Sequence, residues 1–229
     1  METKIYLIIS MAVLVWVCPA RGVLDDKIFT SSGQIVAGEE WDIVNIYNDD
    51  TVVDMLGGSA DYISTFDGSS LNVVDGYAEV GAFDYSTINI SGGELSGAHA
   101  LGNGTVNFYA TGESSGLGAR EFGTANMYGG TVEQLGASDS GLLNVYGGLI
   151  TNCLGASGTS VVNIYGYDFK YDPTGGAYDG GQLTGLWLNG TAFTLDLYGA
   201  ETYSHIKQVP EPSGLVILAL GAILVRRMR

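Results

Sequence analysis

Few residues in this 229-residue chain have the types and spacing that catalysis requires. The two histidines, His99 and His205, lie far apart, and the sequence lacks a serine in a nucleophile-elbow motif. The acidic pair Asp49–Asp50 is of the type used in glycoside hydrolysis, but such pairs are also typical of solvated turns. Cys153 has no histidine in its own stretch, which favours a small buried residue over a nucleophile. The sequence therefore predicts a protein that is not an enzyme, with no catalytic, cofactor-binding or metal-binding residues.

Tyrosine is the side chain that recurs in a regular pattern, two positions after an Asn or Asp. It does so at Tyr47, Tyr109, Tyr128, Tyr146, Tyr165 and Tyr198. One hypothesis is that these rings stack on one another and stiffen the fold. The other is a flat aromatic strip that binds sugar rings, for which the candidate residues are Tyr109, Tyr128, Tyr146 and Tyr165.

These tyrosines belong to a repeat in which an Asn or Asp stands between two apolar residues. The central residues are Asp54, Asn72, Asn89, Asn107, Asn126, Asn144, Asn163 and Asp196, at spacings of 18, 17, 18, 19, 18, 19 and 33. A further copy at Asn45 precedes Asp54 by nine residues. Because side chains alternate along a strand, the apolar pair is predicted to face inward and the Asn outward. Glycine pairs such as Gly129–Gly130 then permit a sharp corner.

A second phrase occupies the other half of the repeat, as "EVGA" at 79–82, "GLGA" at 116–119, "QLGA" at 134–137 and "CLGA" at 153–156. One such unit cannot bury its own apolar row, but units stacked at about 4.8 Å per turn can share a core. The sequence therefore predicts an all-β, single-domain parallel β-solenoid (β-helix) of about 18-residue coils over residues 21–208. The outward Asn residues are predicted to form a hydrogen-bonded ladder. The nine-residue calcium repeat is absent, which weakens a calcium-binding interpretation.

The repeat is interrupted between Asn163 and Asp196. An open solenoid end must be covered, so residues 165–193 are predicted to be an insertion that acts as a cap. The alternative is a binding loop with Tyr167, Asp168, Tyr171, Asp172, Tyr178 and Asp179 as candidate residues.

Both ends of the chain have the composition of targeting segments. Lys4, the apolar run Ile5–Cys18 and the small residues that follow predict a signal peptide and an N-terminal signal helix over residues 1–20. At the other end, an apolar helix is predicted at Gly214–Val225, before a cluster of arginines. Twelve helical residues reach about 18 Å, which is short for a permanent span of a hydrocarbon core of about 30 Å.

Residues 209–229 resemble the PEP-CTERM sorting signal. The resemblance rests on Pro210, Glu211 and Pro212, then the apolar run, then Arg226, Arg227 and Arg229. It implies recognition by an exosortase, a membrane-embedded cysteine protease, which removes the tail near the motif. It also implies a Gram-negative bacterium that makes extracellular polysaccharide, a transient anchor in the inner membrane, and a final location at the cell surface or outside the cell. An ordinary C-terminal membrane anchor is the alternative.

The charge of the remaining chain argues against nucleic acid as a partner. Residues 21–209 keep five basic and 23 acidic side chains, a net charge of −18. With a signal peptidase and an exosortase as processing partners, the chain is hypothesised to be an exported structural or adhesive protein of the cell surface, biofilm or extracellular matrix. The alternatives are a polysaccharide-binding or polysaccharide-processing β-helix protein and a calcium-dependent surface protein.

Overall fold

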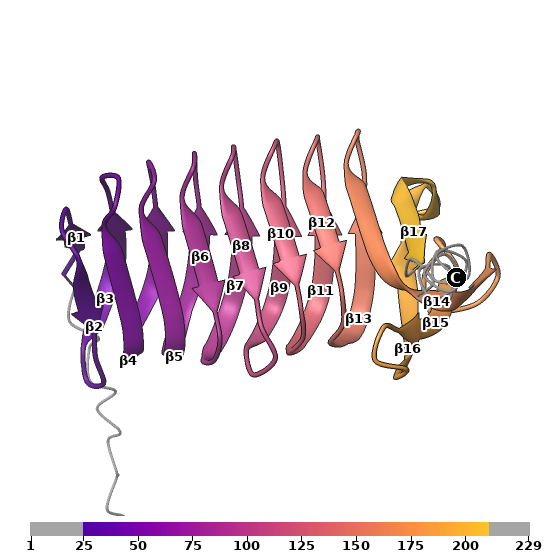
Figure 1. Cartoon of the computed structure of the whole chain (residues 1–229), viewed down its shortest axis with the longest axis horizontal. Coiled ribbons are helices and arrows are strands. Elements are labelled where there is room, and N and C mark those ends of the chain that lie inside the picture. The colour runs from indigo at the N-terminus through magenta and orange to yellow at the C-terminus, as the bar shows by residue number, and fades with distance from the viewer. Residues whose placement is uncertain (1–24, 211–229) are drawn as a thin grey trace, which may run out of the picture.

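The computed structural model describes residues 25–210. In that range seventeen strands and one short 3-10 helix, η1 (Thr202–His205), wind into an elongated stack of coils (Figure 1). The strands are β1 (Lys27–Phe29), β2 (Gly33–Ile35), β3 (Glu40–Ile46), β4 (Val52–Thr65), β5 (Ser70–Ala82), β6 (Thr87–Ile90), β7 (Glu94–Ala100), β8 (Thr105–Phe108), β9 (Glu113–Ala119), β10 (Thr124–Met127), β11 (Thr131–Ala137), β12 (Leu142–Val145), β13 (Leu149–Ala156), β14 (Val161–Asp172), β15 (Gln182–Trp187), β16 (Ala192–Tyr198) and β17 (Ile206–Pro210). The predicted signal helix and the apolar helix at Gly214–Val225 lie outside the described residues.

Each coil contributes one strand to each of two sheet faces. The first face contains β6, β8, β10 and β12, with β2 and the opening parts of β4, β5 and β14. The second face contains β7, β9, β11 and β13, with β3 and the closing parts of β4 and β5. Neighbouring coils pair in parallel and in register, so Asn126 lies opposite both Asn107 and Asn144. The predicted parallel β-solenoid of about 18-residue coils is confirmed, and the structure shows about eight turns.

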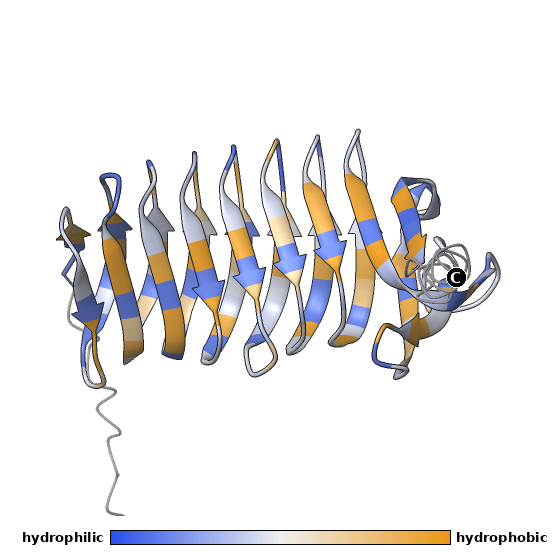
Figure 2. Cartoon of the chain, viewed as in Figure 1, coloured by the Kyte–Doolittle hydropathy of each residue, from blue (hydrophilic) through white to orange (hydrophobic). Residues whose placement is uncertain are grey.

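The core is a set of apolar columns that run along the solenoid. On the first face one inward column consists of Phe108, Met127, Val145 and Ile164, all with 0% exposure. The second face contributes Leu117, Leu135 and Leu154 to the same cluster. The alternation appears as apolar and polar bands along the strands in Figure 2. Burial of a side chain of this size stabilises the folded state by about 1.5–3 kcal/mol. Because each column spans many coils, this stabilisation depends on the presence of neighbouring coils.

Glycine is required at the corner between the two faces. Gly130 has φ 77°, and a Cβ there would lie 2.7 Å from the carbonyl oxygen of Gly112. The turns at the opposite corner instead place acidic residues in the left-handed region, with φ between 54° and 57°, namely Asp67, Asp84, Glu121 and Asp139. Part of the negative charge of the chain therefore lies along this second corner.

Two members of the predicted repeat lie outside the first-face column. Asn45 lies in β3, opposite Ser64 on the second face, so its nine-residue spacing to Asp54 is half a coil. Gln34 occupies the equivalent first-face position, opposite Asp54. Asp196 lies in β16, which runs antiparallel to β15. The 33-residue spacing therefore marks a change of strand direction at the end of the solenoid.

The inserted segment forms an antiparallel unit at the C-terminal end. Strand β14 continues past its coil and pairs with β15, which pairs in turn with β16. Trp187 and Phe193 from this unit are buried, with ring centroids 4.2 Å apart, and both belong to the core cluster. Strand β16 then joins β13 on the second face, and β17 joins β14 on the first. The core thus extends beyond the last regular coil into the insertion.

Candidate functional site

An uninterrupted ladder of side-chain amides runs along the first face. Each Asn donates from its Nδ2 to the Oδ1 of the residue one coil earlier, beginning at Asp54, with distances of 2.8–3.0 Å. The donors are Asn72, Asn89, Asn107, Asn126, Asn144 and Asn163. The ladder predicted from the spacing is confirmed. Because each amide bonds to its neighbours along the column, this row ties the coils together.

Four of the predicted tyrosines form a continuous stack at the glycine corner. The ring centroids of Tyr109 and Tyr128 are 5.2 Å apart, those of Tyr128 and Tyr146 are 4.9 Å apart, and those of Tyr146 and Tyr165 are 4.1 Å apart. The interplanar angles are 10–17°, so both faces of Tyr128 and Tyr146 are covered by neighbouring rings. Burial, followed by a side-chain hydrogen bond with Tyr165, raises the pKa of Tyr146 to about 12. A sugar strip on these residues stays a prediction, and inside the stack it would have to use ring edges and hydroxyls.

Tyr47 and Tyr198 do not belong to this stack, contrary to the prediction. Tyr47 stacks on Phe66 at the opposite corner, with centroids 4.9 Å apart. Tyr198 lies on the second face opposite Gly155, and its ring meets Tyr178 edge-on. The spacing from Asn does not distinguish these positions, because the same phrase occurs on both faces.

Three exposed aliphatic side chains of the earlier coils hold the same position as the stacked tyrosines. Val36, Leu56 and Val74 are 42–51% exposed and directly follow the aligned inward residues Ile35, Met55 and Val73. Tyr109 and Tyr128 hold the equivalent position in later coils, and Ser91 separates the aliphatic group from the tyrosine stack. A search for tyrosine alone finds only the second group, whereas the position after each inward residue identifies both.

A shallow groove with a volume of about 440 Å³ lies on the second face. Its floor contains Gly118, Gly136 and Gly155, which lie opposite one another on β9, β11 and β13. In the same outward column, His99 stands at one end and Tyr198 at the other. We call this feature the glycine groove. The sequence reasoning identified the "GA" phrase as a strand but not as the floor of a groove.

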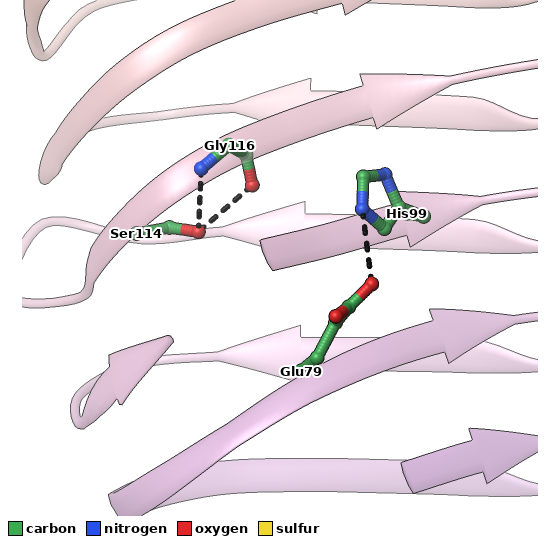
Figure 3. A network of polar contacts seen from close by, with 4 residues as sticks. All are labelled: Glu79, His99, Ser114 and Gly116. Carbon is green, nitrogen blue, oxygen red and sulfur yellow. Dashed lines mark hydrogen bonds and ion pairs between the residues drawn. The ribbon is translucent and has the colours of Figure 1, made fainter. Parts of the chain in front are cut away.

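His99 lies at one end of the groove, and Figure 3 shows its contact with Glu79. Its Nε2 lies 3.6 Å from Oε1 of Glu79, which is one coil earlier. Burial lowers the pKa of His99, the positive charge of Arg120 lowers it further, and Glu79 opposes both effects. Burial and Arg120 outweigh Glu79, so the net shift of the pKa favours a neutral imidazole near pH 7. Nearby, the Ser114 hydroxyl donates to the Gly116 carbonyl at 2.8 Å and shapes the start of the floor strand.

The remaining residues that could do chemistry have structural contacts. Asp49 accepts a hydrogen bond from the Gly68 backbone N–H at 3.0 Å, in agreement with a solvated turn. Cys153 is buried, and burial raises the pKa of its thiol. The Nδ1 of His205 lies 3.0 Å from the Ser160 carbonyl oxygen, which ties η1 to the preceding coil.

The candidate binding-loop residues of the insertion also bond within the fold. Tyr171 donates to the carbonyl oxygen of Gly180 at 3.0 Å, and Tyr178 donates to Asn152. The Asp172 carboxylate accepts from the backbone and hydroxyl of Thr174, and these bonds hold its pKa below the usual range. These contacts stabilise the insertion, in agreement with the cap interpretation.

The sorting motif is described only at Pro210, the last residue of β17, which is exposed. Glu211, Pro212 and the three tail arginines lie outside the described residues. Between residues 25 and 210, no helix has the length and apolar character needed to cross a membrane. In the same part of the chain, no group of three or more His, Cys, Asp or Glu side chains is placed to hold a metal ion. Comparison of the chain with protein-family models, with curated proteins and with solved structures finds no match in any of the three.

Proposed function

We propose that this chain is an exported structural or adhesive protein of the cell surface or extracellular matrix, sorted by an exosortase-type system. The observation that carries the proposal is the uninterrupted ladder from Asp54 to Asn163. In this ladder, the side chains along the middle of the first face form hydrogen bonds between neighbouring coils. A ladder of this kind suits a rigid rod that resists bending and local unfolding outside the cell.

The C-terminal geometry supports the sorting part of the proposal. Strand β17 pairs with β14 up to Pro210, so the folded unit includes the first residue of the Pro210–Pro212 motif. Pro210 is exposed. A protease that cuts after this motif would therefore leave the described strand pairing intact.

A polysaccharide-binding role is the second candidate, and the glycine groove favours it. An enzyme that processes the polysaccharide is a less supported version of this second function. Among the described residues, His99 Nε2 and Glu79 Oε1 form the one contact within 4 Å between a basic and an acidic side chain, at 3.6 Å, and the lowered pKa of His99 favours a neutral ring there.

Processing is tested by expressing the full chain in a Gram-negative cell that has an exosortase and measuring the mass of the extracellular form. We expect a product that lacks residues 1–20 and the region after the Pro210–Pro212 motif. A variant with Pro210, Glu211 and Pro212 changed to Ala should keep its tail and stay with the membrane fraction. An extracellular form with an intact Arg229 would refute the sorting proposal.

A further inference from the structure

Three glycines of the glycine groove have no structural requirement for glycine. Gly116, Gly136 and Gly155 lie in strands, and none has a positive φ. A Cβ at Gly116 or Gly136 would meet nothing within 4 Å, and at Gly155 the nearest atom would be 3.6 Å away. Gly118 differs, because it is buried and a Cβ there would lie 3.2 Å from Nδ1 of His99. Space and backbone conformation would thus admit a side chain at the first three positions, in contrast to the corner glycine Gly130.

Glycine at these positions has a cost. In the middle of a strand, glycine makes the folded state less stable than alanine would. Three consecutive coils nevertheless carry it in the same outward column, at Gly118, Gly136 and Gly155. Glycine without a packing reason in a strand often marks a place where a ligand or another chain approaches closely. A ligand of this groove must fit a floor with almost no side chains.

The rim of the groove is polar and its floor is flat. Arg120 and Ser138 lie along one side, Gln134 lies on the other, and Tyr198 and His99 close the ends. From His99 to Tyr198 the column takes four strand steps, or about 19 Å. The site is long enough for several units of an extended polymer.

The backbone of the floor disfavours an extended peptide. Strand β11 is paired in parallel with β9 on one side and with β13 on the other, so its N–H and C=O groups are used within the sheet. A peptide lying on this face finds no free strand edge and no side-chain pockets. A sugar ring needs neither, because its C–H face can lie on a flat surface while its hydroxyls reach polar groups at the rim.

The charges around the groove favour a neutral ligand. Arg120 and Glu201 carry opposite charges, and His99 is held toward its neutral form. The domain as a whole is strongly acidic, so an anionic polymer would meet repulsion that a single arginine does not offset.

We propose that the glycine groove binds a neutral linear polysaccharide, whose sugar rings lie on Gly136 and Gly155 and whose hydroxyls bond to rim side chains such as Gln134. The proposal rests on the extracellular role proposed above only for access to such a polymer. It places the sugar site on the second face, away from the tyrosine stack.

The test is a calorimetric titration of the purified full-length chain with cellohexaose, laminarihexaose and maltohexaose, and with hexagalacturonate as the anionic probe. We expect at least one neutral hexasaccharide to bind and the anionic one to bind at least tenfold more weakly. The variant Gly136→Leu should weaken neutral binding at least tenfold without lowering Tm, because it fills the groove at a position that tolerates a side chain. The variant Gln134→Ala, which leaves the backbone unchanged, should weaken binding at least threefold. Ser96→Leu, an exposed strand position outside the groove, is the matched control.

The proposal is overturned if none of the neutral probes binds, if hexagalacturonate binds best, or if Gly136→Leu and Gln134→Ala bind as the unchanged chain does. Competition by a synthetic peptide of residues 211–229 that is lost in Gly136→Leu would also overturn it, by assigning the groove to the tail. These outcomes are independent of export. If the tail is not removed in cells, the sorting proposal is refuted, but the result of the binding titration is unaffected.

Discussion

At the scale of single residues, polar side chains in this molecule act mainly on the coil before them and the coil after them. An Asn inside the ladder donates a hydrogen bond to the Asn of the preceding coil and accepts one from the Asn of the following coil. A residue with two such partners stabilises more than its own contacts suggest, because its removal leaves two groups unpaired.

Asn144 is the most buried member of the ladder, with 8% exposure, and it gives the sharpest test. Asn144→Ala removes its bonds to Asn126 and Asn163 and leaves an acceptor and a donor without side-chain partners. We expect a loss of about 1–3 kcal/mol in the free energy of unfolding, measured by denaturant titration. Asn103→Ala, at an exposed turn, is the control and should change stability by less than about 0.5 kcal/mol. Equal effects of the two changes would contradict the role of the ladder.

At the scale of elements, the period of the sequence predicts much of the fold, because the pattern of apolar neighbours around each Asn repeats with the coil. The alternation identifies the buried columns and the outward ladder. It does not distinguish the two faces, because both have an Asn between two buried apolar residues. Val44 and Ile46 flank Asn45 on the second face, and Leu143 and Val145 flank Asn144 on the first.

The candidate sites were less predictable than the fold. The glycine groove depends on which strands lie side by side, and Tyr198 reaches it only because β16 returns to β13 after the antiparallel insertion. The period of the sequence does not predict that β16 pairs with β13 after the insertion. The tyrosine column was predictable as a column, but the covered ring faces follow from the ring orientation at the corner.

The corner stack makes a prediction at this scale, because it joins four successive coils. Changing Tyr128 and Tyr146 together to Ala removes three stacked pairs, each worth about 0.5–1.5 kcal/mol. We expect a clear fall in Tm. The control is the pair Tyr85→Ala and Phe122→Ala, which are 76% and 70% exposed at turns of the opposite corner. An unchanged Tm with lost binding to the cell's polysaccharide would instead support the aromatic sugar strip.

At the scale of the whole molecule, the outer surface carries many like charges with few partners. Residues 21–209 have a net charge of −18, and within the described chain the one contact between a basic and an acidic side chain joins Glu79 to His99, whose lowered pKa favours the neutral form. Stacked coils bring equivalent side chains to the spacing of neighbouring strands, about 4.8 Å. Exposed Glu94 and Glu113 lie directly opposite each other in this way. Like charges so placed destabilise the folded state.

Salt should therefore stabilise this solenoid. The Debye length falls from about 8 Å at 0.15 M to about 3 Å at 1 M, which screens repulsion between neighbouring coils. We expect Tm to rise by several degrees between 0.15 M and 1 M NaCl, followed by circular dichroism with EDTA present to exclude divalent cations. Glu113→Gln removes one member of the opposed pair, so it should raise Tm at low salt and reduce the salt effect. A Tm that stays constant or falls with added NaCl would show that repulsion between coils does not limit the stability of the molecule.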